Sequence, residues 1–419
     1  MEISAHDNKF IASTGIDSVE TAPHRSLCTD CGVSRTSNPK QCATACQFIK
    51  PDYAGLEIKV HGRQRDAEVE DEIHFGPFKH MYRASLKTPS PGAQWSGITT
   101  RIAEKLLEQG RVDAVLTMQA DPNDRWRPVP VLINQAKEMK KARGMRMGYA
   151  PLLSLLEPAQ RLGYKKLAII GIPCQIYALR ALEKTLGLEE LFVIGTPCSD
   201  NTTTENFHQF LNLITPNPEE VTYLEFKANY HVELRFQNGR VKEIPFLQLP
   251  LSDLPKDFFP LTCRTCVDYT NVLSDITVGY MGGEGEQWII TRNKKGEELL
   301  ALLADEVVLK APGSAGKRHS AVVGFKKNVE LAAGGLPLRK MPNWLRPIVS
   351  WLMPRIGPRG LEFARTRVEM KAIESILHLR RELPSRMKHM IPAHIWSLAE
   401  PYDLSPKPQE KTNMTRASR

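Results

Sequence analysis

Eight cysteines are the residues of this 419-residue chain whose type and spacing point most directly to chemistry. They fill two sets of four with none left over. An N-terminal set contains Cys28, Cys31, Cys42 and Cys46, and an inner set contains Cys174, Cys198, Cys263 and Cys266. A cubane iron–sulfur cluster needs four thiolates. The cysteine count therefore predicts two such clusters.

The inner set begins with an internal repeat. Residues 167–174 (LAIIGIPC) recur as residues 191–198 (LFVIGTPC), with a helix-length segment between them. This pattern predicts a β-α-β unit whose strands both end in Gly-x-Pro-Cys. If the strands are parallel neighbours, both thiols leave one carboxyl edge about 5–10 Å apart, where open α/β sheets bind ligands. Cys263 and Cys266 then need only fold over that edge; the alternative is that the strand-end cysteines are inert, buried residues.

The N-terminal set leaves two kinds of metal site open. Its spacing is Cys-x2-Cys, a ten-residue gap and Cys-x3-Cys, which suits an iron–sulfur cluster and equally a tetrahedral zinc site. It departs from the bacterial ferredoxin pattern in the long gap and in having Gln47, rather than proline, after the last cysteine. A second predicted cluster elsewhere makes electron transfer the more economical interpretation.

The N-terminal residues contain no charged-then-apolar signal, and acidic residues such as Glu2 and Asp17 argue against a transit peptide. No apolar run reaches the roughly 18 residues of a spanning helix. We therefore expect a bacterial-type cytoplasmic protein, where thiols stay reduced and grouped cysteines bind metal more often than they form disulfides.

The net charge of +9 comes from the C-terminal part of the chain. From residue 339 onward, 16 Lys and Arg residues oppose 7 Asp and Glu residues. A solvated surface is the simplest interpretation. Interleaved apolar residues such as Trp344 and Trp351 also suggest contact with a membrane surface or with another subunit, including a second copy of the chain. We do not expect nucleic acid as a partner, because no recognition motif accompanies the charge.

Apolar runs alternate with helical patterns between about residues 90 and 335. Helices are expected at 98–108, 152–161 and 175–186, and strands at 113–118, 166–170 and 191–194. This alternation predicts an α/β fold with a mixed, largely parallel sheet. Within 221–246, Gln237-Asn238-Gly239 predicts an antiparallel hairpin. We expect an N-terminal iron–sulfur domain (1–85), an α/β core (86–340), and a basic, amphipathic helical extension (341–419) with a helix near 360–381 and a disordered end.

Six short motifs occur in a characteristic order: Gly92–Ile98, Gly171–Gln175, Gly195–Asn201, Cys263–Tyr269, Ser274–Gly282 and Gln287–Asn293. With these motifs the chain resembles the flavoprotein family of the β subunit of deazaflavin-coenzyme hydrogenases. The N-terminal cysteines, Val60–Arg63 and Gly360–Arg365 also resemble its chlorophyll-biosynthesis branch, which holds ferredoxin-dependent 8-vinyl reductases and 7-hydroxymethyl chlorophyll a reductases. The resemblance covers roughly residues 25 to 380.

The resemblance implies that the core is a flavoprotein with one FAD and that each cysteine set holds a 4Fe-4S cluster. No Gly-x-Gly-x-x-Gly follows the first strand, so a Rossmann-style flavin site is not expected. Glycines would allow the flavin to approach the backbone closely, and an arginine would bind a phosphate of FAD. The implied flavin residues are Gln94, Trp95, Ser96, Gly97, Thr99, Gly279, Gly282, Gly283, Gln287 and Arg292. The alternative for the glycines is an ordinary turn after a strand, and the alternative for Trp95 and Trp288 is a place in the hydrophobic core.

The implied activity is reduction of the 8-vinyl group of a divinyl (proto)chlorophyllide. Electrons would pass from ferredoxin through the N-terminal cluster, the inner cluster and FAD. The alternatives are a 7-hydroxymethyl chlorophyll a reductase, an electron-transfer β subunit of a hydrogenase or dehydrogenase complex, and a zinc-bearing binding module. No catalytic residue is assigned; His61, His74 and Tyr280 are candidate proton donors by chemistry alone. Ferredoxins are typically acidic, so docking is expected at Arg25, Arg35, Lys40, Lys50, Lys59, Arg63 and Arg65.

Overall fold

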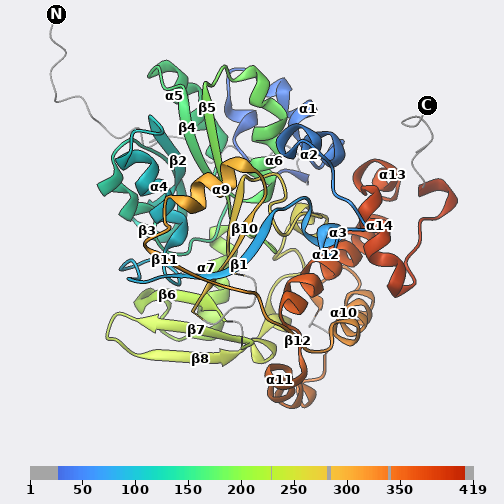
Figure 1. Cartoon of the computed structure of the whole chain (residues 1–419). Helices are drawn as coiled ribbons and strands as arrows, with labels where there is room; N and C mark the ends of the chain where they lie inside the picture. The colour runs from blue at the N-terminus through green and yellow to red at the C-terminus, as the bar shows by residue number, and fades with distance from the viewer. Residues whose placement is uncertain (1–26, 228, 281–284, 338–340, 411–419) are drawn as a thin grey trace, which may run out of the picture.

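An eight-stranded sheet forms the centre of the computed structural model, which describes residues 27–227, 229–280, 285–337 and 341–410 (Figure 1). The strand order is β11-β1-β10-β9-β5-β4-β2-β3. In chain order the strands are β1 (His80–Leu86), β2 (Ala114–Asp121), β3 (Asp124–Ile133), β4 (Lys166–Gly171), β5 (Glu190–Gly195), β9 (Ile276–Gly279), β10 (Gln287–Thr291) and β11 (Val307–Lys310).

Only the middle of this sheet is parallel. Strands β2, β4, β5 and β9 run parallel, giving three parallel pairings, whereas the other four pairings are antiparallel. The prediction of a mixed sheet is confirmed, but the prediction that it is largely parallel is wrong. The reason lies outside the β-α-β repeat. The turn from Asp121 to Asp124 is too short for a crossover, so β3 returns antiparallel to β2, and β1, β10 and β11 extend the opposite end of the sheet.

Helices cover both faces of the parallel strands. Along β4, Leu167 and Ile169 pack against α5 (Leu156–Arg161) and α6 (Pro173–Leu182). The alternate residues Ala168 and Ile170 pack towards α4 (Ile98–Glu108) and α9 (Lys294–Ala301). This alternation follows from the two-residue period of a strand. The predicted strands and helices of this region are present, and the helix expected at 152–161 is a 3-10 turn, Leu152–Leu155, followed by α5.

A separate three-stranded antiparallel sheet lies beside the core. It consists of β6 (Val221–Phe226), β7 (His231–Phe236) and β8 (Val241–Pro245), and it packs on α7 (Thr204–Ile214). The predicted hairpin is confirmed, with Gln237-Asn238-Gly239 at the turn between β7 and β8. Gly239 has φ 79°, a conformation that glycine adopts without strain.

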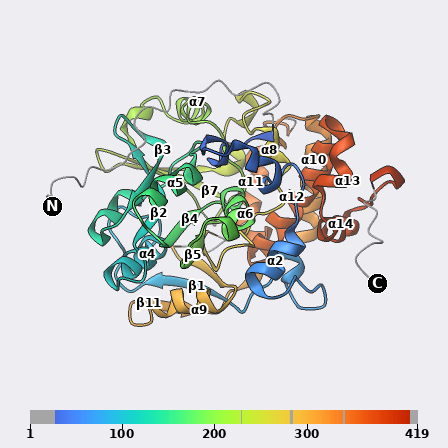
Figure 2. The ribbon, with the colours of Figure 1, turned by 90° about the horizontal axis from the view of Figure 1, so that it is seen from above.

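The last helices pack with the N-terminal segment in one core. They are α10 (Arg318–Ala332), α11 (Leu345–Ile356), α12 (Leu361–Glu382), α13 (Met387–Met390) and α14 (Ala393–Ala399). Apart from α11, they bury apolar residues against Phe48 and Phe75. Figures 1 and 2 both place α10, α12, α13 and α14 on the opposite side of the molecule from α4, β2 and β3. The helix expected at 360–381 is therefore present as α12. Among the described residues, no helix has the length and apolar character needed to cross a membrane.

Short elements complete the fold. They are α1 (Cys42–Ala45), α2 (Tyr53–His61), α3 (Glu72–Phe75), α8 (Leu261–Arg264), β12 (Ser314–Ala315) and β13 (Arg359–Gly360). The division into domains at residues 85 and 340 stays a prediction.

Candidate functional site

The two strands of the internal repeat end side by side. Strands β4 and β5 are parallel neighbours, with Gly171 opposite Gly195. The amide of Thr196 donates to the Gly171 carbonyl at 3.0 Å. Cys174 lies in the first turn of α6, and Cys198 follows β5 by three residues. The predicted parallel pairing is thus confirmed, and both cysteines belong to the carboxyl edge of the sheet.

Close packing at this edge requires small residues. Asn271 donates from Nδ2 to the carbonyls of Gly171 and Thr196, at 2.8 and 3.2 Å. A Cβ atom on Gly195 would lie 2.6 Å from the Asn271 side chain, and one on Gly279 would lie 2.4 Å from Pro197. Gly279, expected from the resemblance to allow approach of a flavin, therefore already has a packing role against the Thr196-Pro197-Cys198 segment.

The segment carrying Cys263 and Cys266 folds over the same edge. The amide of Cys198 donates to the Tyr269 carbonyl at 3.0 Å, and the amide of Asn201 donates to Cys263 Sγ at 3.4 Å. Burial raises the pKa of the Cys263 thiol to about 12 and that of Cys266 to about 11. Burial, together with the charges of the other inner cysteines, raises the pKa values of Cys174 and Cys198 well above the ordinary range. The four inner thiols therefore form one electrostatic group.

A buried lysine from α12 ties this group together. Lys371 is 2% exposed, and its Nζ donates to the Cys263 carbonyl at 2.5 Å, to Asp200 at 2.9 Å and to Glu374 at 3.0 Å. Burial acts to lower the pKa of Lys371, but the carboxylates of Asp200 and Glu374 outweigh it and raise that pKa. The lysine therefore stays charged, and its charge favours thiolates at Cys263 and Cys266.

The N-terminal set packs beside α6 and the 3-10 turn at Leu152–Leu155. The Cys31 carbonyl accepts from the Leu153 amide at 2.9 Å, and a Cβ on Gly32 would lie 2.5 Å from the Ser154 amide. Burial raises the pKa of Cys31 to about 12, and the charges of the other three N-terminal cysteines add to that effect. This set is therefore a second electrostatic group, held against the core by the 3-10 turn at Leu152–Leu155.

Two contacts join the two cysteine sets. Gln47, which directly follows Cys46, donates from Nε2 to Cys266 Sγ at 3.7 Å. The Tyr53 hydroxyl donates to Gln47 Oε1 at 2.6 Å and fixes the orientation of the amide. The second contact joins the Thr29 side chain to Cys174. Burial is the main cause of the raised pKa of Cys174; the hydrogen bond with Thr29 lowers that pKa, and the charge of Cys31 raises it. The two sets therefore adjoin inside the protein.

All eight cysteines are free thiols. Within the part of the chain that the structure describes, no three or more His, Cys, Asp or Glu side chains converge as ligands of a single metal ion. A single zinc ion holds its thiolates about 3.8 Å apart, whereas a four-iron cubane spreads its four ligands around a larger body. Ligation of either set stays a prediction.

Several predicted flavin residues come together at the β9–β10 end of the edge. Gly97, with φ 91°, precedes α4, and Gln287 Oε1 accepts from the Ile98 amide at 2.9 Å and from Ser96 Oγ at 3.3 Å. Trp95 stacks on Tyr280, with ring centroids 5.8 Å apart and planes 11° from parallel. Gln94 donates to the Leu224 carbonyl at 3.4 Å, and Thr99 lies half-buried in the first turn of α4. Gly282 and Gly283 lie outside the described residues.

Arg292 does not join this group. Its side chain is 3% exposed, and its nitrogen atoms donate to Thr277, Phe75, Pro77 and Thr270 over distances of 2.6 to 3.3 Å. The prediction that Arg292 is available for a flavin phosphate is therefore corrected. The arginine instead ties the N-terminal segment to β9 and β10.

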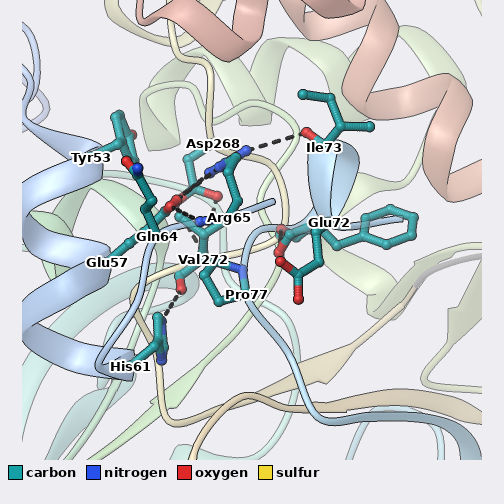
Figure 3. A network of polar contacts seen from close by, with 12 residues as sticks. Tyr53, Glu57, His61, Gln64, Arg65, Glu72, Ile73, Pro77, Asp268 and Val272 are labelled. Carbon is teal, nitrogen blue, oxygen red and sulfur yellow. Dashed lines mark hydrogen bonds and ion pairs between the residues drawn. The ribbon is translucent and has the colours of Figure 1, made fainter. Parts of the chain in front are cut away.

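The three candidate proton donors lie in different surroundings. His61 Nε2 is 2.8 Å from the Val272 carbonyl, and burial lowers the pKa of this histidine to about 3 (Figure 3). His74 is 3.0 Å from Glu369 and 3.2 Å from Arg318. Tyr280 alone lies among the predicted flavin residues, and burial raises its pKa well above the ordinary value. Figure 3 also shows Arg65, which bonds Glu57 and the Ile73 carbonyl beside Asp268.

Most of the described basic residues around the N-terminal set are already paired. Arg35 pairs with Asp30, Arg63 with Glu72, Arg65 with Glu57 and Lys59 with Glu183. Lys40 and Lys50 are exposed, and Arg25 lies outside the described residues. The docking surface stays a prediction, and Lys40 and Lys50 are its exposed lysines. A surface groove of about 500 Å³ lies elsewhere, between β1, β11 and α9, and none of the predicted site residues lines it.

Sequence reasoning missed Gln47 and Lys371. Gln47 was noted only as a departure from a ferredoxin pattern, although its place directly after Cys46 was a usable signal. Lys371 shares a helix face with Val368, Ala372 and Ser375, spaced at three and four residues, and that spacing already puts the lysine in a buried stripe. The sequence does not show that α12 packs over the Cys263 segment, because that contact depends on tertiary packing.

Comparison with known proteins agrees with this arrangement. Models described as coenzyme F420 hydrogenase/dehydrogenase, β subunit N-term and C terminus match residues 81–157 and 164–314. An uncharacterised protein of Nostoc sp. (strain PCC 7120) is 36% identical over 91% of this chain and 95% of its own length. The 7-hydroxymethyl chlorophyll a reductase of Oryza sativa subsp. japonica is 36% identical over 91% of this chain and 83% of its length.

More distant relatives match only the core. The β subunit of the coenzyme F420 hydrogenase of Methanosarcina barkeri is 28% identical over 49% of this chain and 72% of its own length. A chain of the F420-reducing [NiFe] hydrogenase complex of the same organism is 20% identical, with a TM-score of 0.53 over 72% of this chain and 92% of that chain, and so shares the fold. The chain belongs to the coenzyme F420 hydrogenase/dehydrogenase β-subunit family, in the branch that contains the rice reductase.

Proposed function

We propose that this protein is a reductase of chlorophyll-type magnesium tetrapyrroles that takes electrons from reduced ferredoxin. The observation that carries the proposal is the continuity between the inner cysteines and the aromatic pair Trp95 and Tyr280. Cys198 bonds Tyr269 through the backbone, the Tyr269 hydroxyl donates to the Tyr280 carbonyl at 3.5 Å, and Tyr280 stacks on Trp95. The N-terminal set adjoins the inner set through Gln47.

The residues at this edge fit two four-iron clusters and FAD. Each set offers four thiols, seven of them half-buried and that of Cys263 fully buried. Lys371 supplies a positive charge that offsets the thiolates of the inner set. Gln94, Trp95, Ser96, Gly97, Thr99 and Gln287 would hold the flavin. When bound, the clusters supply single electrons and the flavin delivers them in pairs as a hydride.

The chain's own residues supply binding and a proton at this edge. Trp95, Tyr280 and Phe363 form an aromatic group, with Tyr280 and Phe363 in edge contact at 5.7 Å. Aromatic faces of this kind bind planar ring systems. Tyr280 is the candidate proton donor that suits this position best, because it alone of the three lies among the predicted flavin residues, stacked on Trp95. Burial raises its pKa, which keeps the hydroxyl protonated but also makes it a weaker acid.

Two groups on the pigment are candidates for reduction. The first is the 8-vinyl group, expected because the chain resembles a bacterial protein; it takes up two electrons and two protons to become ethyl. The 36% identity to the rice 7-hydroxymethyl chlorophyll a reductase favours a second candidate. In that reaction a hydroxymethyl group takes up two electrons and two protons, becomes methyl and releases water.

An anaerobic assay separates these reactions. The protein is incubated with reduced ferredoxin and either divinyl chlorophyllide a or 7-hydroxymethyl chlorophyll a, and the pigments are analysed by chromatography and mass spectrometry. A product that has gained two hydrogens supports vinyl reduction, whereas a product that has lost one oxygen supports hydroxymethyl reduction. If both pigments are unchanged while coenzyme F420 is reduced or oxidised, the protein is an electron-transfer subunit instead.

A further inference from the structure

Helix α11 is inverted relative to an ordinary surface helix. A surface helix normally turns apolar residues towards the core and polar residues towards water. In α11 the buried residues are Arg346 and Ser350, each 7% exposed, whereas Trp344, Ile348 and Trp351 are 71%, 49% and 61% exposed. At 3.6 residues per turn, these three residues lie on the side of the helix opposite Arg346 and Ser350.

The protein body fixes this orientation. The Arg346 guanidinium donates to the Leu249 carbonyl at 3.4 Å and to the Ser252 hydroxyl, both in the segment that follows β8. A buried arginine with such partners is costly to remove from its place. The outward direction of the two tryptophans is therefore built into the fold.

The charged residues of the α11 segment itself have one sign. Residues 341–361 contain three arginines and no aspartate or glutamate. Arg355 is exposed and lies over the Trp351 ring, with its Cζ 4.3 Å from the ring centroid, and exposed Arg359 follows the helix. Figure 1 shows α11 at the margin of the molecule, below α10 and β12.

We propose that α11 docks the protein on the surface of an anionic lipid bilayer. The docking face consists of Trp344, Ile348, Trp351, Arg355 and Ile356. Tryptophan rings settle at the level of lipid headgroups, aliphatic side chains reach the acyl boundary, and arginines pair with lipid phosphates. This inference goes beyond the proposed function and does not rest on it.

A second copy of the chain fits the docking face less well. A twofold contact of a face with itself brings like residues together. The arginines of both copies would then share one interface, and residues 341–361 offer no carboxylate to offset them. An anionic bilayer supplies the opposite charge and accepts exposed tryptophan.

Vesicle flotation with the full chain tests the proposal. We expect binding to vesicles that contain phosphatidylglycerol, weaker binding to phosphatidylcholine alone, and loss of the difference at high salt. Trp344→Ser and Trp351→Ser should each lower the vesicle partition coefficient about tenfold, because each removes a large exposed apolar surface. Arg355→Gln with Arg359→Gln should reduce binding to anionic vesicles only.

The matched control is Leu213→Ser, which removes an apolar side chain on α7 that is 42% exposed; it should bind vesicles as the unchanged protein does. Circular dichroism and sedimentation velocity are measured on every variant. The proposal is overturned if the unchanged protein binds neither vesicle, or if the tryptophan variants bind as well as it does. It is equally overturned if the chain is a dimer that these variants dissociate and no vesicle binding occurs, because the face is then covered by a second copy.

Discussion

Gln47 donates a hydrogen bond to Cys266 Sγ at 3.7 Å and thereby connects the end of the N-terminal cysteine set with the inner set. The amide is 6% exposed and is oriented by the Tyr53 hydroxyl, which donates to its oxygen. Hydrogen bonds to cluster sulfurs favour the more negative, reduced state. If the inner set holds a cluster as proposed, Gln47 should have an electronic role in addition to its structural one.

Gln47→Leu should lower the reduction potential of the inner cluster, because the reduced state loses a hydrogen bond to Cys266. It should also cost about 1–3 kcal/mol of stability, since the buried Tyr53 hydroxyl loses its acceptor. Potentiometric titration followed by electron paramagnetic resonance measures the first effect, and urea unfolding measures the second. Tyr53→Phe is the comparison variant: it keeps Gln47 but removes the hydroxyl that orients its amide, so it should shift the potential less than Gln47→Leu does. Equal potentials in Gln47→Leu and the unchanged protein would contradict this role.

The two cysteine sets should have separable roles. We expect about eight iron and eight sulfide per chain, with one FAD and no stoichiometric zinc. Cys263→Ser or Cys266→Ser should remove about half the iron and much of the flavin, because the inner set shares its strand edge with the predicted flavin residues. Cys28→Ser or Cys31→Ser should spare the flavin and stop ferredoxin-driven turnover. Metal analysis and flavin absorbance check this, and equal flavin loss in both pairs would refute the separation.

Acid should destabilise the protein through His61. Burial lowers its folded-state pKa to about 3, below the ordinary value of 6.5. As the pH falls below 6.5, the unfolded chain binds a proton that the folded chain does not, so the stabilisation is present above about pH 6.5 and is lost as the pH falls towards about 3. By about pH 5 the loss should reach about 2 kcal/mol.

His61→Gln should remove that part of the pH dependence, because glutamine does not titrate. Anaerobic urea unfolding at about pH 7.5 and about pH 5 measures the difference. His389→Gln, at an exposed position, is the control and should keep the full pH dependence. An unchanged dependence in His61→Gln would mean that other groups cause the acid sensitivity.

Lys40 and Lys50 should govern docking of ferredoxin. Screening shortens the reach of charge from about 10 Å at 0.1 M salt to about 3 Å at 1 M, so rising salt should slow ferredoxin-driven turnover more than turnover with a small uncharged reductant. Lys40→Glu with Lys50→Glu should mimic high salt and leave the flavin spectrum unchanged. Lys165→Glu, just before β4 and so at the other end of that strand, is the control. The same salt response with both reductants would place the docking site elsewhere.

The parts of the molecule governed by local pattern were predictable from the sequence. The repeat ending at Cys174 and Cys198 predicted parallel neighbouring strands, since its two strands are joined by a helix of the right length. The antiparallel ends of the sheet were not predicted, because the pairing of β1 with β10 joins residues about 200 positions apart. Arg292 was misassigned for a similar reason: a sequence shows a cation, but only packing reveals the four residues that already accept its hydrogen bonds.

The most direct test of the proposed reductase activity counts electrons. In an anaerobic mixture of the protein, a limiting amount of pigment and excess reduced ferredoxin, the oxidation of ferredoxin is followed by absorbance and the pigment by chromatography. We expect two ferredoxins oxidised for every pigment reduced, and no pigment reduced when Cys266→Ser replaces the unchanged protein. Ferredoxin oxidation that leaves both candidate pigments unaltered would contradict the proposed activity.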